Sequence, residues 1–122
     1  MFDHIGIGVA NLQASKTFLV RALTPLGAGV VMEVPDAVGI GPPRQPSLWL
    51  GQAAGKPVPL HIAFVAENRR QVDEFYRAAL AAGGKDNGAP GLRPHYHANY
   101  YAAFVIGPDG HNFEAVCHRP EA

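Results

Sequence analysis

Two histidines and one glutamate have the residue types and positions that a metal site would use. His4 begins the segment HIGIGV and His61 begins HIAFV, so each starts a short run of alternating apolar residues. Glu114 follows the turn GPDG in the run FEAVC, where a carboxylate is costly to bury without a partner. Two neutral imidazoles and one carboxylate are a common ligand set for a divalent metal. The alternative is that the histidines make structural hydrogen bonds. Glu114 would then form a salt bridge or lie on an exposed strand face.

The two histidines occupy equivalent positions of an internal repeat. Aligning residue 4 with residue 61 brings HIGIGVANLQASKTFLVRAL onto HIAFVAENRRQVDEFYRAAL. Each copy starts with the two-residue period of a strand and reaches an asparagine, Asn11 or Asn68, that can cap a helix. Apolar residues then follow at helical spacing in both copies. Each half of the chain therefore begins with a strand and an amphipathic helix.

Short extended runs separated by turn residues predict three further strands in each half. They cover residues 28–34, 37–40 and 47–50, and then 85–90, 99–106 and 113–117. This pattern predicts an α+β fold made of two βαβββ modules related by internal duplication, with helices on one side of the sheets. The modules span residues 1–51 and 60–118, with a linker at 52–59, inside one domain of residues 1–122.

Composition and charge argue against several classes of function. The 122 residues, 48% hydrophobic and 16% charged, fit one globular domain. Ten basic residues balance ten acidic ones without a basic cluster, so nucleic-acid binding is not expected. No apolar run is long enough to cross a bilayer, and no secretion signal opens the chain, so no membrane partner is expected. A single cysteine, Cys117, allows no internal disulfide, which predicts a buried thiol and a cytoplasmic location.

These motifs resemble those of the vicinal oxygen chelate superfamily, which includes glyoxalase I, extradiol dioxygenases, and fosfomycin and bleomycin resistance proteins. DHIGIGVANLQASKTF, HIAFVAENRRQVDEF and GPDGHNFEAV carry the resemblance, which extends over essentially the whole chain. It implies two modules with a curved mixed sheet around a metal-binding cleft, and places the metal ligands on His4, His61 and Glu114. The implied cofactor is a divalent metal ion, namely Zn, Fe, Mn, Co or Ni.

Trp49, or Ser47 in the same register, stands where glyoxalase-type members commonly supply a fourth ligand. The strand reads PSLWLG, and a tryptophan can neither bind a metal nor accept a proton. The remaining set resembles the three-ligand His-His-Glu arrangement of the extradiol dioxygenases. Trp49 is therefore expected to contact substrate instead.

The stretch GLRPHYHANYY supplies the other substrate-binding candidates. Polar aromatic side chains so concentrated can orient an oxygen-rich molecule, and an arginine can pair with a carboxylate. The candidates are Arg93, His95, His97, Tyr100 and Tyr101. The alternative is a surface loop with solvated histidines and packed tyrosines. No general base stands out among them.

The sequence favours a metal-dependent lyase or isomerase of the glyoxalase type, acting on a small molecule with adjacent oxygens. One alternative is a metal-free protein that binds a drug or metabolite, and another is an extradiol-type iron dioxygenase. The expected partners are this small-molecule substrate and a second copy of the chain, because curled sheets leave edges that are commonly paired. Whether one chain or a homodimer builds the site stays open at this point.

Gly6 and Gly8 follow His4 on one face of the first strand. Glycine is a poor strand residue, so this face is expected to line a cleft in which larger side chains would take up space. A Gly8→Val change should then leave stability intact, since valine suits a strand. The remaining histidines, His111 and His118, are expected at the surface or at strand ends.

Overall fold

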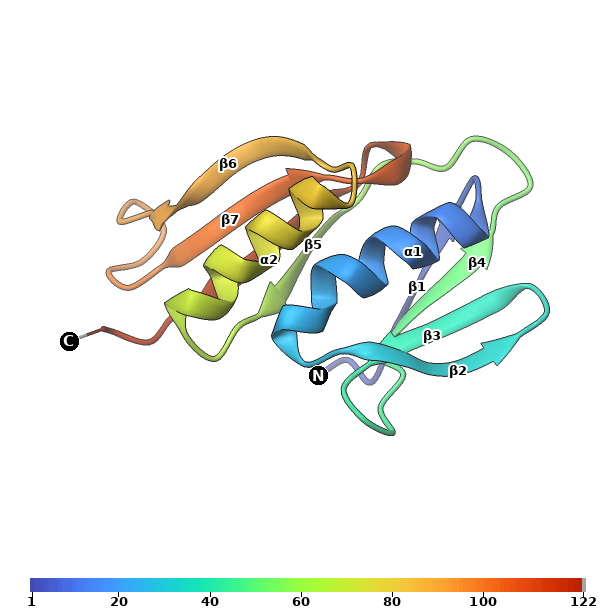
Figure 1. The fold of residues 1–122 in the computed structure, drawn as a ribbon, viewed down its shortest axis with the longest axis horizontal. Helices are drawn as coiled ribbons and strands as arrows, with labels where there is room; N and C mark the ends of the chain where they lie inside the picture. The colour runs from blue at the N-terminus through green and yellow to red at the C-terminus, as the bar shows by residue number, and fades with distance from the viewer. Residues whose placement is uncertain (122) are drawn as a thin grey trace.

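A computed structural model describes residues 1–121 and confirms the α+β fold of two βαβββ modules (Figure 1). The first module contains β1 (Ile5–Val9), α1 (Leu12–Leu23), a 3-10 turn (Thr24–Leu26), β2 (Gly29–Val34), β3 (Ala37–Gly41) and β4 (Leu48–Gln52). The second contains β5 (His61–Val65), α2 (Arg69–Ala81), β6 (Lys85–Leu92), β7 (Tyr101–Ile106), a 3-10 turn (Pro108–Gly110) and β8 (Asn112–Cys117).

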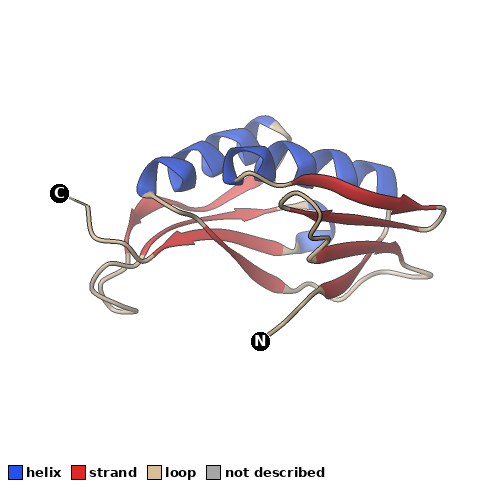
Figure 2. Cartoon of the chain, turned by 90° about the horizontal axis from the view of Figure 1, so that it is seen from below, coloured by secondary structure: helices blue, strands red, loops and turns tan. Residues whose placement is uncertain are grey.

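Each module forms its own mixed four-stranded sheet, and the two sheets have matching strand orders. The orders are β1-β4-β3-β2 and β5-β8-β7-β6, with β1 parallel to β4 and β5 parallel to β8. Both helices lie on the same side of the sheets and contact one another (Figure 2). Within residues 1–121, the opposite face of each sheet is not covered by a helix, and His4 and His61 are expected on these uncovered faces.

Local chemistry explains why both helices begin where the sequence predicts. The side chain of Asn11 accepts a hydrogen bond from the Ala14 N–H at 3.0 Å, and Asn68 accepts one from the Gln71 N–H at 2.8 Å. Each bond satisfies an amide that the first helical turn leaves free. The buried stripe of α1 is the predicted one, namely Ser15, Phe18, Leu19, Ala22 and Leu23.

The two modules share one hydrophobic core. The ring of Phe113 on β8 lies 6.0 Å from that of Phe18 on α1 and 6.0 Å from that of Phe64 on β5. The loop before β8 adds polar contacts to the first module, because the Asp109 carboxylate accepts a hydrogen bond from the Ala10 N–H at 3.0 Å. These contacts hold the two halves of the chain together.

His111 lies at a strand end, directly before β8, as one of the two expectations had it, but it is not at the surface, since it is only 1% exposed. Its Nδ1 accepts a hydrogen bond from the Leu60 N–H at 2.9 Å, and its Nε2 lies 3.3 Å from the Gly8 carbonyl oxygen. The imidazole therefore joins the start of β5 to β1. The turn before β8 folds it inward, a long-range contact that local sequence does not reveal. His118, in contrast, is exposed as expected.

Strands β1 and β5 each lie at the edge of their sheet. Within residues 1–121, β1 pairs only with β4, and β5 only with β8. Apolar side chains are exposed along both strands or at their ends, with Ile5 39%, Leu60 42% and Val65 79% exposed.

Within residues 1–121, neither helix is long and apolar enough to span a bilayer.

Candidate functional site

The structure brings two of the three predicted ligands together. His61 Nε2 lies 2.8 Å from Glu114 Oε1. The Glu114 side chain is only 2% exposed, whereas that of His61 is 54% exposed. A buried carboxylate is thus held against an imidazole that solvent can reach.

Strand register explains this meeting. In the parallel pair β5–β8, Ala63 lies beside Glu114, and on the other side of β8 Phe104 of β7 lies beside Glu114. Neighbours in register share a sheet face, and residues two apart on a strand do too. His61 and Glu114 therefore share the face turned away from the helices.

Tyr100 completes the immediate surroundings of the carboxylate. Its hydroxyl donates a hydrogen bond to Glu114 Oε2. Burial, followed by this hydrogen bond and the nearby negative charge, raises the pKa of Tyr100 to about 12. The phenol therefore stays protonated at neutral pH and acts as a hydrogen-bond donor rather than as a base.

His4 does not join this group within one chain. It precedes β1, its Nδ1 lies 2.7 Å from the Asp3 carboxylate, and its side chain is 57% exposed. The contact between His111 and Gly8 brings the far end of β1 to the start of β5. Four residues of strand span about 13 Å, so His4 lies away from that junction. The two edge strands thus do not place their histidines side by side in one chain.

Metal-ligand chemistry fits part of the predicted set in one chain. In residues 1–121, no three His, Cys, Asp or Glu side chains lie where they could share a metal ion. The pair of His61 and Glu114 supplies one nitrogen and one oxygen donor that already converge. Such a pair suits a divalent ion that takes its remaining ligands elsewhere.

A slot opens beside the exposed imidazole, and we call it the His61 slot. Its lining residues come from β5, β6, β7, β8 and the loop after β6: His61, Asn87, Arg93, Tyr96, Phe104 and Asn112. The Phe104 ring lies 6.1 Å from that of His61. Register with Glu114 could have suggested Phe104 and Asn112 from the sequence. Asn87 lies on an irregular strand and Tyr96 in a loop, so no local pattern marks them.

The other candidates from the polar aromatic stretch occupy different places. Arg93 lines the His61 slot, His95 packs against Tyr96 with ring centroids 4.2 Å apart, and His97 faces His118 at 5.6 Å. Tyr101 pairs with Cys117 on β8, an odd number of residues from Glu114, so its side chain lies on the helix side.

Tyr101 has a clear structural contact on that side. Its hydroxyl donates a hydrogen bond to Asp73 Oδ1 of α2 at 2.6 Å. Burial and this bond raise the pKa of Tyr101 to about 12. Tyr101 thus anchors α2 to β7, and its role with substrate stays a prediction.

Trp49 shares the histidine face of the first sheet, as expected. It lies in register between Gly6 of β1 and Gly39 of β3. A Cβ atom at Gly39 would come within 3.0 Å of the indole and 2.8 Å of Pro46 Cβ, so the indole lies across Gly39. A Cβ atom at Gly6 would meet nothing within 4 Å, whereas one at Gly8 would lie 3.3 Å from Ala53 Cβ. The open position on this face is therefore Gly6.

These contacts predict opposite effects for two alanine substitutions in the same row of the sheet. Gly6→Ala should raise the free energy of unfolding by about 0.4–1 kcal/mol, because it restricts the unfolded chain without a clash. Gly39→Ala should lower it by about 1–3 kcal/mol, because Trp49 and Pro46 must move. Thermal or urea unfolding of both variants tests this. A strongly destabilised Gly6→Ala variant would contradict the conclusion that the space above Gly6 is open.

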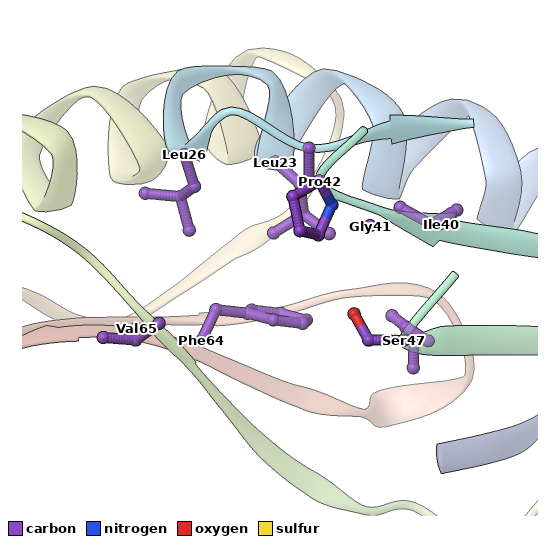
Figure 3. A pocket seen from close by; sticks show the side chains of 10 residues that line it. Leu23, Leu26, Ile40, Gly41, Pro42, Ser47, Phe64 and Val65 are labelled. Carbon is purple, nitrogen blue, oxygen red and sulfur yellow. The ribbon is translucent and has the colours of Figure 1, made fainter. Parts of the chain in front are cut away.

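A second pocket lies between the modules and has a different character (Figure 3). Leu23, Leu26, Ile40 and Pro42 of the first module face Phe64 and Val65 of the second. Its lining contains no titratable side chain. Of these two pockets, the His61 slot is the one with titratable side chains that could act on a substrate.

Comparisons with known proteins agree with this architecture. Residues 1–115 match the model of the Glyoxalase/Bleomycin resistance protein/Dioxygenase superfamily. No curated protein matches the chain. A glyoxalase/bleomycin resistance protein from Albidiferax ferrireducens T118 has 28% identity and a TM-score of 0.82, over 98% of this chain and 99% of that one.

Two more distant structures share the fold. A glyoxalase/bleomycin resistance protein/dioxygenase family enzyme from Burkholderia phytofirmans PsJN has a TM-score of 0.72 at 16% identity, covering 96% of this chain and 98% of that one. A glyoxalase-related enzyme from Fulvimarina pelagi has a TM-score of 0.67 at 20% identity, covering 93% and 84%.

Proposed function

Because the chain belongs to the glyoxalase/bleomycin resistance protein/dioxygenase superfamily, we propose that it is a metal-dependent enzyme of the lyase or isomerase type. Its substrate is a small molecule with two adjacent oxygens. The observation that carries this proposal is the convergence of His61 and Glu114 at 2.8 Å, with the carboxylate almost fully buried. A protein that only binds an apolar molecule has no need for a buried carboxylate, which is costly to desolvate.

We further propose that the active form is a homodimer in which His4 of the partner subunit completes each site. Both histidines lie at edge strands that, within residues 1–121, pair with a neighbouring strand on one side only. Each adjoins an exposed apolar residue, Ile5 after His4 and Leu60 before His61. Pairing two copies would cover these edges and their apolar side chains, which favours association.

The residues of one chain then have separable roles. His61 and Glu114 hold the divalent metal, which when bound polarises two adjacent substrate oxygens as a Lewis acid. The Tyr100 hydroxyl fixes the orientation of the Glu114 carboxylate through its hydrogen bond. Burial of that carboxylate beneath His61 limits the access of water to its oxygens. Phe104, beside Glu114, supplies an apolar wall next to the imidazole.

Metal analysis combined with sedimentation tests this proposal on the wild-type protein. The 13.0 kDa chain should sediment as a dimer at micromolar concentration, with about one divalent ion per chain from Zn, Fe, Mn, Co or Ni. A monomer that binds none of these ions would contradict the proposal and favour a metal-free binding protein. Oxygen consumption by an iron-loaded protein, rather than iron alone, would favour the dioxygenase alternative.

A further inference from the structure

Arg93 places a positive charge in the His61 slot and forms no ion pair with a carboxylate of residues 1–121. The ion pairs of this part of the chain involve other residues. The guanidinium carbon lies 5.3 Å from the centre of the Phe104 ring, and Phe104 is the strand neighbour of Glu114. Arg93 therefore lies on the same sheet face as His61 and Glu114.

Backbone carbonyls use three of the five N–H donors of Arg93. Nη1 donates to the carbonyl oxygens of Gly91 at 2.7 Å and Ala102 at 3.1 Å, and Nη2 donates to that of Ala89 at 2.9 Å. Nε–H and one Nη2–H find no acceptor in residues 1–121. Guanidinium donors form a planar fork that suits the two oxygens of a carboxylate.

Strand β6 is shaped around this side chain. Its pairing with β7 shifts between Asp86 and Gly88 and again between Gly88 and Gly91. Gly88 has φ +149°, and a Cβ atom there would lie 3.0 Å from Arg93 Nη2. The irregular backbone and the missing side chain let the guanidinium lie close to the strand. The remaining donors are thus held in place before a ligand arrives, which lowers the entropy cost of binding.

The rest of the slot suits a small oxygen-rich acid. The amides of Asn87 and Asn112, joined by a 3.3 Å hydrogen bond, add polar groups, while Tyr96 and Phe104 add aromatic walls. Glu114 is only 1% exposed, and its two oxygens are already engaged by His61 and Tyr100. The permanent charge that the lining presents to an incoming ligand is that of Arg93.

We propose that the His61 slot binds a carboxylate of the substrate through the free Nε–H and Nη2–H of Arg93. The substrate class is then a small acid with an oxygen on the carbon next to the carboxylate, such as a 2-hydroxy or 2-oxo acid. This assignment rests on the proposed function for the reaction, but the carboxylate contact itself requires only Arg93 and the slot.

Nuclear magnetic resonance of the 15N-labelled wild-type protein tests the contact directly. Titration with L-lactate should shift the Nε–H signal of Arg93 in a saturable manner. L-Lactamide, which has the same shape but no charge, should produce no saturable shift. An unmoved Arg93 signal with lactate, or equal binding of lactamide or of inorganic phosphate, would overturn the proposal.

Two variants distinguish binding by the paired N–H donors of Arg93 from binding by its positive charge alone. Arg93→Lys keeps the charge but not the paired donors, and should weaken lactate binding at least about tenfold. Arg77→Lys, at an exposed position of α2, should bind lactate like the wild type. If Arg93→Lys does not fold, the wild-type Nε–H titration still decides the matter. Metal uptake, measured on the same samples after incubation with Zn, Fe, Mn, Co or Ni, tests the proposed function separately: a protein that binds lactate but takes up none of these ions would refute that function and leave the carboxylate site standing.

Discussion

Mixing two inactive variants should restore metal binding that neither variant has alone. His4→Ala and His61→Ala should each lower the metal affinity by at least about 100-fold, since losing a ligand costs more than losing its supporting partner. In the proposed homodimer, a His61→Ala chain can still supply His4 to a His4→Ala chain, whose His61 and Glu114 are intact. One complete site then forms in each mixed dimer.

The size of the recovery follows from the pairing of subunits. Random exchange of equal amounts gives about half mixed dimers with one complete site out of two, so about a quarter of the wild-type metal content returns. A mixture of His61→Ala with Glu114→Ala is the matched control, because both residues belong to one chain's half of the site, and it should recover nothing. Recovery in the control, or none in the first mixture despite subunit exchange, would rule out a shared site.

Sequence was sufficient for much of the fold because the decisive signals are local. The caps at Asn11 and Asn68 and the buried stripe of α1 follow from residue types and spacing within a few turns. Strand β6, Lys85–Leu92, is less clear from the sequence, since Gly88, Pro90 and Gly91 weaken the strand pattern. The structure explains this weakness, because the pairing of β6 with β7 shifts register twice.

The site depended on contacts between distant residues, and here the sequence carried less information. Repeat symmetry makes His4 and His61 equivalent within their modules, yet it does not determine how the modules pack. Asp109 and His111 hold the first module so that His4 lies away from His61 in one chain. The hydrogen bond of Tyr100 to Glu114 crosses from a loop to a strand and has no local signature.

Replacing Glu114 by glutamine should abolish metal binding while leaving the metal-free fold almost unchanged. The glutamine oxygen can still accept the Tyr100 hydroxyl, and its amide can donate to a neutral His61 Nε2, so both hydrogen bonds persist. In the presence of a chelator, the free energy of unfolding should therefore stay within about 1 kcal/mol of the wild type. A neutral amide is a poor ligand beside an imidazole, so the added metal should no longer bind.

Thermal unfolding with and without metal makes the difference measurable. A metal at a hundred times its Kd stabilises the wild type by about 2.7 kcal/mol, which raises Tm by roughly 10 °C for a domain of this size. Glu114→Gln should show no such rise, while Glu74→Gln, which removes only a surface ion pair with Arg70, should keep it. If Glu114 instead serves only as a structural partner of a protonated His61, the wild type would show no metal-induced rise. Glu114→Gln would then destabilise the chelated protein, because it would leave the imidazolium without its counter-charge.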